Sequence, residues 1–149
     1  MLVLRFTAVF LMAAFAVGGW TLGGGWMWLG TAFVFVLTPV GDILLGQNEE
    51  PVDEAEAQRG AYTLLLYLWA TAQLGVSVYA VYLLPSLTAP ELLALAVTWG
   101  VVNGGAGITV AHELMHRRRK LDQGLAEALM LVVAYPHFCI EHVLGHHKN

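Results

Sequence analysis

The chain has 149 residues, of which 58% are hydrophobic and 12% are charged, and its mean hydropathy is +0.65. Soluble domains carry about 25% charged residues, so this composition excludes an ordinary soluble domain and indicates an integral membrane protein. The net charge of −4 excludes a basic surface for nucleic acid. The single cysteine, Cys139, excludes an intrachain disulfide and is expected to be a buried structural thiol.

The first apolar region is long enough for two helices. Residues 6–41 carry no charged side chain, whereas about 20 residues cross a bilayer as one helix. The glycine-rich run at residues 18–25 therefore predicts a break, with helices over roughly residues 2–18 and 26–45. Trp20, Trp26 and Trp28 lie at this break, where tryptophan commonly anchors a helix at the membrane interface. The acidic residues 47–60 are predicted to form a polar connector outside the membrane.

Two further charge-free spans cover residues 61–84 and 92–111, and a turn between two prolines separates them. Each span is long enough to cross the membrane. The second span is rich in small residues, which let neighbouring helices approach closely or leave room for a bound substrate. Packing is the simpler use, and Asn103, Gly104 and Gly107 are the candidates for lining a substrate channel.

The last apolar region, residues 121–140, is interrupted by Asp122, Glu127 and Pro136. This pattern predicts an interfacial or re-entrant helix rather than a full crossing. The sequence therefore predicts an all-α integral membrane protein with about four transmembrane helices and one interfacial or re-entrant helix, forming a single membrane domain over residues 1–149. All seven Lys and Arg residues then fall on one side. The positive-inside rule makes that side cytoplasmic. The connector and both histidine clusters are therefore predicted to lie on the cytoplasmic side.

Five of the six histidines lie in two clusters, at residues 112–116 and 142–147. Residues four apart share one face of a helix, so His112 and His116 form one chelating pair, and His142 and His146 form a second. His147 points about 100° away from His146, which places it poorly for the same ion and well for a second ion nearby. The spacing indicates a centre with two metal ions.

The chemistry of these clusters favours a transition metal, since imidazole suits iron, zinc or copper. Glu113 and Glu141 each adjoin a histidine and are expected to accept a ring N–H from it. His137 lies outside both clusters and is expected to be structural. His-Glu-x-x-His is also the motif of zinc proteases, but a catalytic zinc needs three protein ligands, whereas this chain offers five histidines.

Taken together, His-Glu-Leu-Met-His-Arg at residues 112–117 and Glu-His-Val-Leu-Gly-His-His at residues 141–147 resemble two histidine motifs of the integral-membrane alkane monooxygenases. These belong with the membrane fatty-acid desaturases and xylene monooxygenases. The resemblance extends to the residues at 100–104, at 137–138, and at 39–42 with Gly46. The family's later motifs, Asn-Tyr-x-Glu-His-Tyr-Gly and a final His-x-x-His-His, have no counterpart in this chain.

The resemblance implies a six-helix enzyme with a non-haem di-iron centre, of which this chain is the N-terminal part. The implied ligands to two iron ions are His112, His116, His142, His146 and His147. Since five histidines do not complete two irons in the family pattern, the chain alone is expected to be inactive. The family also implies a bacterial inner membrane location, and electrons from a rubredoxin-like carrier with its NAD(P)H-dependent reductase.

The function expected from this resemblance is O₂-dependent hydroxylation of the terminal C–H of an alkane. Fatty-acyl desaturation and hydroxylation of an aromatic methyl group use the same kind of metal centre and stay open. An intramembrane zinc protease is the alternative from another class. A metal transporter or metal-binding module is disfavoured, because transport needs ionisable residues inside the crossings and the charge-free cores of the four predicted crossings contain no charged group.

Overall fold

In the computed structural model, which describes residues 6–46 and 60–144, every described element is helical. The N-terminal part consists of α2 (Val9–Leu22), a 3₁₀ turn (Gly24–Trp28), α3 (Leu29–Ala32), a π-helical turn (Phe33–Leu37) and α4 (Thr38–Leu45). Next come α6 (Gly60–Leu83), a 3₁₀ turn (Leu84–Ser86), α7 (Ala89–Val102), a second π-helical turn (Asn103–Gly107) and α8 (Ile108–Met115). The described chain ends with α9 (Lys120–Val132) and α10 (Phe138–Leu144).

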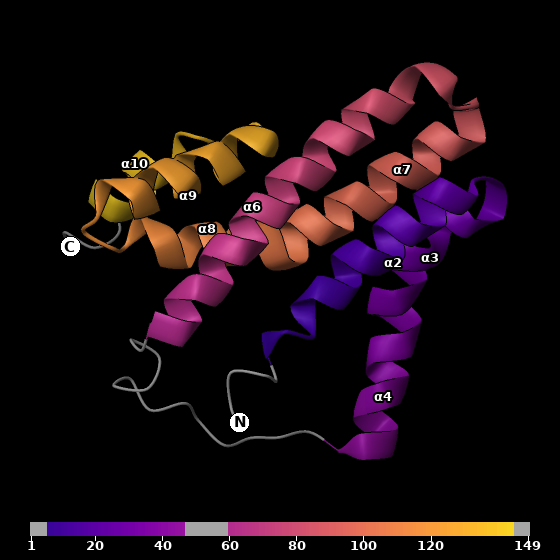
Figure 1. Cartoon of the computed structure of the whole chain (residues 1–149), viewed down its shortest axis with the longest axis horizontal. Helices are drawn as coiled ribbons and strands as arrows, with labels where there is room; N and C mark the ends of the chain where they lie inside the picture. Colours follow the sequence, from indigo (N-terminus) through magenta and orange to yellow (C-terminus); the bar gives the residue numbers. More distant parts are fainter. Residues whose placement is uncertain (1–5, 47–59, 145–149) are drawn as a thin grey trace.

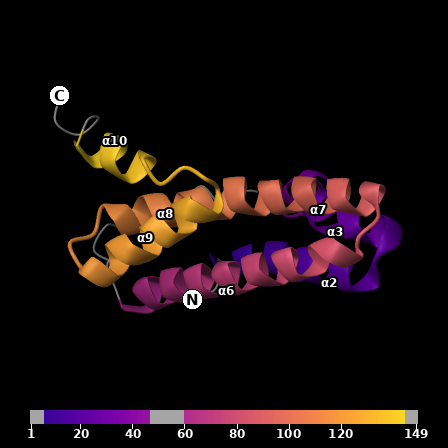
Figure 2. The ribbon, with the colours of Figure 1, turned by 90° about the horizontal axis from the view of Figure 1, so that it is seen from above.

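Three stretches are long and apolar enough to cross a membrane: Gly24–Leu44, Gly60–Ser86 and Ala89–Met115. Figures 1 and 2 show α6 and the continuous α7–α8 rod side by side, with α2 and α3 packed near the start of α7. Helix α4 leaves the bundle, and its exposed side chains include Val40, Ile43 and Leu44. The prediction of an all-α protein is confirmed over the described residues, which include apolar helices long enough to cross a membrane. Helix α2 has 14 residues, which is fewer than the about 20 that one crossing needs.

The hairpin turn lies within the glycine-rich run 18–25, as predicted, but the first helix ends later than residue 18. Helix α2 continues through Gly18 and Gly19 to Leu22, and the chain turns at Gly23 and Gly24, whose φ angles are +72° and +55°. Only glycine adopts such angles readily. Gly19 serves packing instead, since a side chain there would overlap the carbonyl group of Trp26. One glycine-rich run therefore contains both a close helix contact and a turn, and composition alone does not separate them.

The predicted span at residues 61–84 is confirmed by α6, but the next helix begins earlier than residue 92. Thr88 and Glu91 form a capping box at the start of α7, and the Glu91 carboxylate also accepts the backbone N–H of Gly24 at 2.9 Å. Pro90 is tolerated because the first turn of a helix needs no donated N–H. The absence of charge marks the apolar core of the span, whereas the cap sets where the helix begins.

A buried polar pair joins α6 to the second π-helical turn. Gln73 Nε2 donates to Asn103 Oδ1 at 2.6 Å, and Asn103 Nδ2 donates to the Trp99 carbonyl at 2.8 Å. Gly107 allows this contact, because a side chain at residue 107 would overlap the Gln73 amide. Asn103, which the sequence places as a polar group within a span, thus has its partner on the neighbouring helix.

Replacing Asn103 with leucine is expected to destabilise the protein by about 1–2 kcal/mol, because the buried Gln73 amide loses its hydrogen-bond acceptor. The double variant N103L/Q73L should recover most of this loss, since removing both polar groups leaves neither unpaired. Thermal unfolding in detergent measures both effects. Equal midpoints for the wild type and N103L would contradict the prediction.

Candidate metal centre

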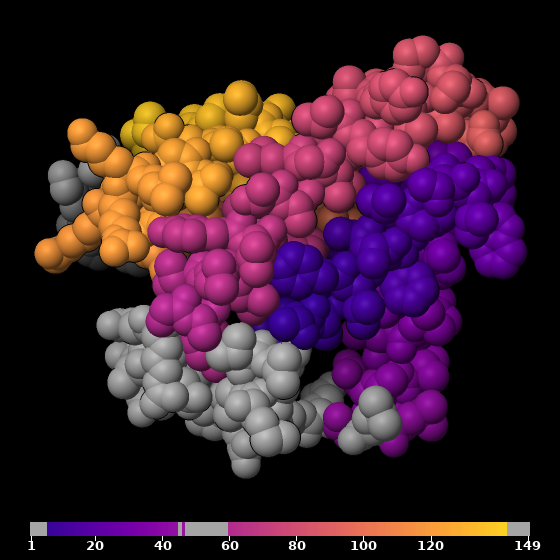
Figure 3. All heavy atoms as spheres, in the orientation of Figure 1, coloured from indigo at the N-terminus to yellow at the C-terminus, as the bar shows by residue number. Residues whose placement is uncertain are grey.

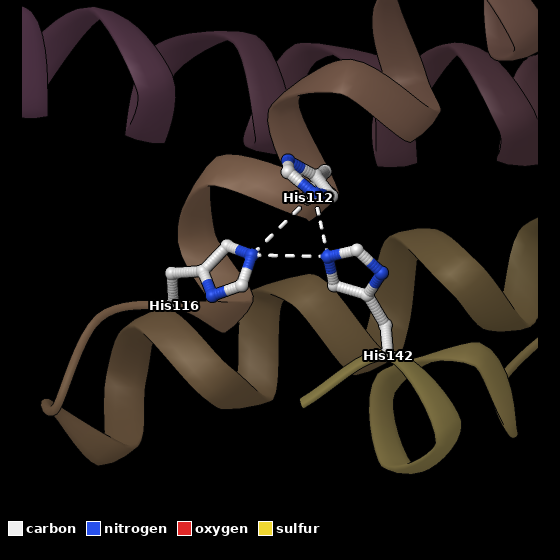
Figure 4. Close-up of side chains that lie close together, drawn as sticks. All are labelled: His112, His116 and His142. Carbon is white, nitrogen blue, oxygen red and sulfur yellow. Dashed lines mark hydrogen bonds between the residues drawn. The ribbon is translucent and has the colours of Figure 1, made fainter. Parts of the chain in front are cut away.

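Three histidine rings converge at one end of the helical bundle. Their Nε2 atoms are separated by 2.8 Å between His112 and His142, 3.2 Å between His142 and His116, and 3.4 Å between His116 and His112 (Figure 4). His112 and His142 are partly buried, whereas His116 is exposed. These three residues form a group that could hold a metal ion within the part of the chain that is described.

The pairing of His112 with His116 follows from the local helix. Both lie at the end of α8, one turn apart, with ring centroids 4.7 Å from each other. The apolar residues Ala111, Leu114 and Met115 face the core, which turns the two histidines to the opposite side of the helix. The two rings therefore lie next to each other, as residues four apart in a helix do, and their chelation of a metal ion stays a prediction.

His142 reaches this pair from α10 by way of a reversal of the chain. Helix α9 runs back along α8, and Ala134 with φ of +56° turns the chain before α10 begins. The partly buried Phe138 ring packs against the core that α8 and α9 form and also stacks on His142, with centroids 4.9 Å apart. Packing of α9 and α10 therefore brings His142 to α8 across a sequence separation of 30 residues from His112.

The three nitrogens fit a metal ion by both distance and chemistry. Ligand nitrogens that each lie about 2.0–2.1 Å from one tetrahedral ion are about 3.3 Å apart, and the observed separations of 2.8 to 3.4 Å bracket this value. Each Nε2 of a neutral imidazole is either a donor or an acceptor, so at least one of the three N···N contacts would join two donors or two acceptors. A cation would accept all three lone pairs.

The other predicted site residues are distributed as follows. His146 and His147 lie outside the described residues. The Glu113 carboxylate forms an ion pair with Arg117, with a distance of 3.1 Å to Nη2, and Glu141 is exposed beside His142. His137 is exposed and packs edge-on against Tyr135, away from the three-histidine cluster. Burial and the nearby Glu127 carboxylate raise the pKa of the Cys139 thiol.

Two apolar clefts lie along the bundle. A cleft of about 760 Å³ between α6 and α7 is lined by Asn103 and Gly104, whereas Gly107 packs against Gln73 and does not line it. A second cleft of about 390 Å³ lies between α2, α6 and α8 and has Glu113, next to His112, in its wall. Phe6, Met12 and the buried Trp69 contribute to this second cleft. Sequence reasoning missed these residues, because no local motif marks them.

The fold and the site define a class: an all-α membrane protein that gathers histidines for a metal ion where a long apolar helix ends. No protein-family model matches the chain. The chain is 35% identical to alkane 1-monooxygenase 2 of Pseudomonas aeruginosa, over 87% of this chain and 38% of that protein. It is 36% identical to alkane 1-monooxygenase 1 of Alcanivorax borkumensis, over 84% of this chain and 33% of that protein.

The chain is also 29% identical to the xylene/toluene monooxygenase hydroxylase component XylM of Pseudomonas putida, over 97% of this chain and 39% of that protein. It therefore spans between 33% and 39% of the length of these curated relatives. Over most of its length the chain is therefore similar to the N-terminal part of these longer alkane 1-monooxygenases.

Proposed function

We propose that this chain provides the N-terminal membrane region of an enzyme that hydroxylates the terminal C–H of an alkane, using O₂ and a centre of two iron ions. The convergence of His112, His116 and His142 at the end of an apolar bundle carries this proposal. The names of the relatives support it, since several are alkane 1-monooxygenases. The rest of the active protein would supply the remaining ligands.

In this proposal His112, His116 and His142 hold one iron ion. His146 and His147 are further ligands in the centre of two iron ions. Glu113 and Glu141 stand beside the ligands, where Glu141 would accept a ring N–H and Glu113 keeps its ion pair with Arg117. When bound, the iron supplies the activation of O₂ that attack on an unreactive C–H bond requires. The chain's own residues position the hydrocarbon and exclude water.

The hydrocarbon is placed in the cleft beside Glu113, because this is the apolar cavity whose wall reaches a neighbour of a ligand histidine. Its lining is almost wholly apolar, which suits a molecule without polar groups. The cleft lined by Asn103 and Gly104 lies along the same α7–α8 rod and offers an approach from the lipid.

The proposed topology has four crossings, with α2 as the first, and places the metal centre on the cytoplasmic side of a bacterial inner membrane. Arg117, Arg118, Arg119 and Lys120 follow directly after the ligand helix, which supports this orientation through the positive-inside rule. Residues 47–60 would then form a cytoplasmic connector; residues 47–59 lie outside the described residues. On this side, a rubredoxin-like carrier would deliver two electrons for each turnover and would be reduced again by its NAD(P)H-dependent reductase.

Product analysis tests the proposed reaction. The intact gene product, with rubredoxin and its reductase, is expected to convert octane to 1-octanol, while iron analysis should find two ions per protein. The similarity to XylM favours an aromatic methyl group as the second candidate substrate, so m-xylene belongs in the same assay. An alkene formed from an acyl lipid, with no alcohol from either hydrocarbon, would establish desaturation instead. Zinc in place of iron, with peptide hydrolysis, would contradict the proposal altogether.

A further inference from the structure

The ligand His116 stands where the backbone of α8 has ended. Helix α8 ends at Met115, and the turn at residues 116–119 leads into α9. Helix ends fray, because their last carbonyl groups have no partner within the helix. A histidine at such a position keeps a fixed place relative to His112 and His142 only if something outside α8 holds the turn.

Two hydrogen bonds to α6 flank this turn. On the side of α8, Arg117 Nη1 donates to Thr63 Oγ1 at 2.7 Å, while the same guanidinium binds Glu113. On the side of α9, the Tyr67 hydroxyl donates to the carboxylate of Asp122. Thr63 and Tyr67 lie one turn apart on α6. In Figure 3 the N-terminal half of α6 and the orange segment that carries this turn lie against each other.

Asp122 is the less ordinary of these partners, because it is only 2% exposed. A carboxylate in the first turn of a helix such as α9 is favourable in solvent, so helix capping does not require its burial. Removing a carboxylate from water is costly unless hydrogen bonds compensate, and the Tyr67 hydroxyl supplies such a bond. The burial of Asp122 is thus explained by a tie between α9 and α6.

We propose that the two bonds Thr63–Arg117 and Tyr67–Asp122, here termed the α6 clamp, position His116 and the start of α9 so that the three Nε2 atoms converge. The four members are positioning residues, since they act through His116 and through the packing of α9 that carries α10. This inference rests on the proposed metal centre. It assigns to α6, which contributes no described ligand, the task of fixing ligand geometry.

Metal titration tests the clamp. The probe is Co²⁺, added to the metal-free intact protein in nanodiscs, because its visible absorption reports ligand number and geometry. Tyr67→Phe and Thr63→Val are each expected to weaken Co²⁺ binding by about tenfold, as removal of outer partners does at other metal sites, and to alter the absorption bands. Thr71→Val is the matched control, since its hydroxyl binds the Tyr67 carbonyl within α6 and makes no tie to α8 or α9.

Two variants of Asp122 test whether its hydrogen bond with Tyr67, rather than its charge or the stability of the fold, affects Co²⁺ binding. Asp122→Asn keeps an acceptor for Tyr67 and should bind Co²⁺ nearly as the wild type does, whereas Asp122→Ala should lose affinity as Tyr67→Phe does. Thermal midpoints of the metal-free variants control for loss of fold. Affinities and spectra of Tyr67→Phe and Thr63→Val equal to those of Thr71→Val would overturn the clamp. If the His142→Ala variant bound Co²⁺ as tightly as the wild type does, the proposed metal centre itself would be wrong. This result distinguishes failure of the metal centre from failure of the clamp alone.

Discussion

Replacing His112, His116 or His142 with alanine is expected to lower metal affinity by more than about 100-fold and to abolish the proposed hydroxylation by the intact protein. Loss of an outer-shell partner alone costs about 10–100-fold, and each of these changes removes one of three nitrogens that lie within 3.4 Å of one another. Metal content after gel filtration, measured by mass spectrometry, together with product formation from octane, checks the prediction. Prolonged dialysis against a chelator should reproduce the same loss in the wild type.

His137→Ala is the matched control for these variants. The residue is a histidine of the same chain and lies close to α10, but its ring packs against Tyr135 rather than in the cluster. Its variant should keep full metal content. If His137→Ala lost as much metal as His142→Ala, the three-histidine cluster would not be the site that holds the ion.

Replacing Gly30 with alanine is expected to destabilise the protein by about 1–3 kcal/mol, the usual cost of forcing an extra group into a packed interior. A methyl group at Gly30 would lie 2.6 Å from the Thr98 Cγ2 atom and 3.0 Å from the backbone Cα of Ala16. Neither neighbour can move easily, because Thr98 binds Thr31 and the Met27 carbonyl and Ala16 is part of α2. Thermal unfolding in detergent should show a clearly lowered midpoint.

Gly18→Ala provides the comparison. Gly18 is also helical, but a methyl group there would meet no atom within 4 Å, and alanine favours a helix over glycine by up to about 1 kcal/mol. Its midpoint should be unchanged or raised. A midpoint for Gly30→Ala that matches that of Gly18→Ala would show that α2, α3 and α7 do not meet as closely as described.

The helices could be predicted from the sequence as far as charge and length determine them. The span of α6 was predictable to within a residue, because apolar composition and the following proline act locally. The turn was predicted in the correct glycine-rich run, but the end of the first helix was placed too early, because Gly19 and Gly23 look alike in the sequence. One admits a neighbouring carbonyl group, whereas the other adopts a positive φ. Both π-helical turns were also missed, because they depend on packing between helices.

The metal site was predictable in its residue types and only partly in its geometry. The spacing of His112 and His116 places both on one face of any helix. The meeting of this pair with His142 depends on a turn at Ala134, an alanine in a conformation that usually signals glycine or asparagine. The clamp residues Tyr67 and Asp122 lie 55 positions apart, and a single sequence offers no sign that they are partners.

The convergence of the rings through Nε2 has a consequence for where their protons reside. A neutral imidazole carries a single ring proton, so each ring that gives its Nε2 lone pair to an ion must be the Nδ1–H tautomer. The three rings then point donors outward, and their surroundings must accept these protons. The end of a helix is well suited to this, because its last carbonyl groups lack partners within the helix. Bound to one ion in this way, all three rings would hold the same tautomer, with each ring proton on the side away from the ion.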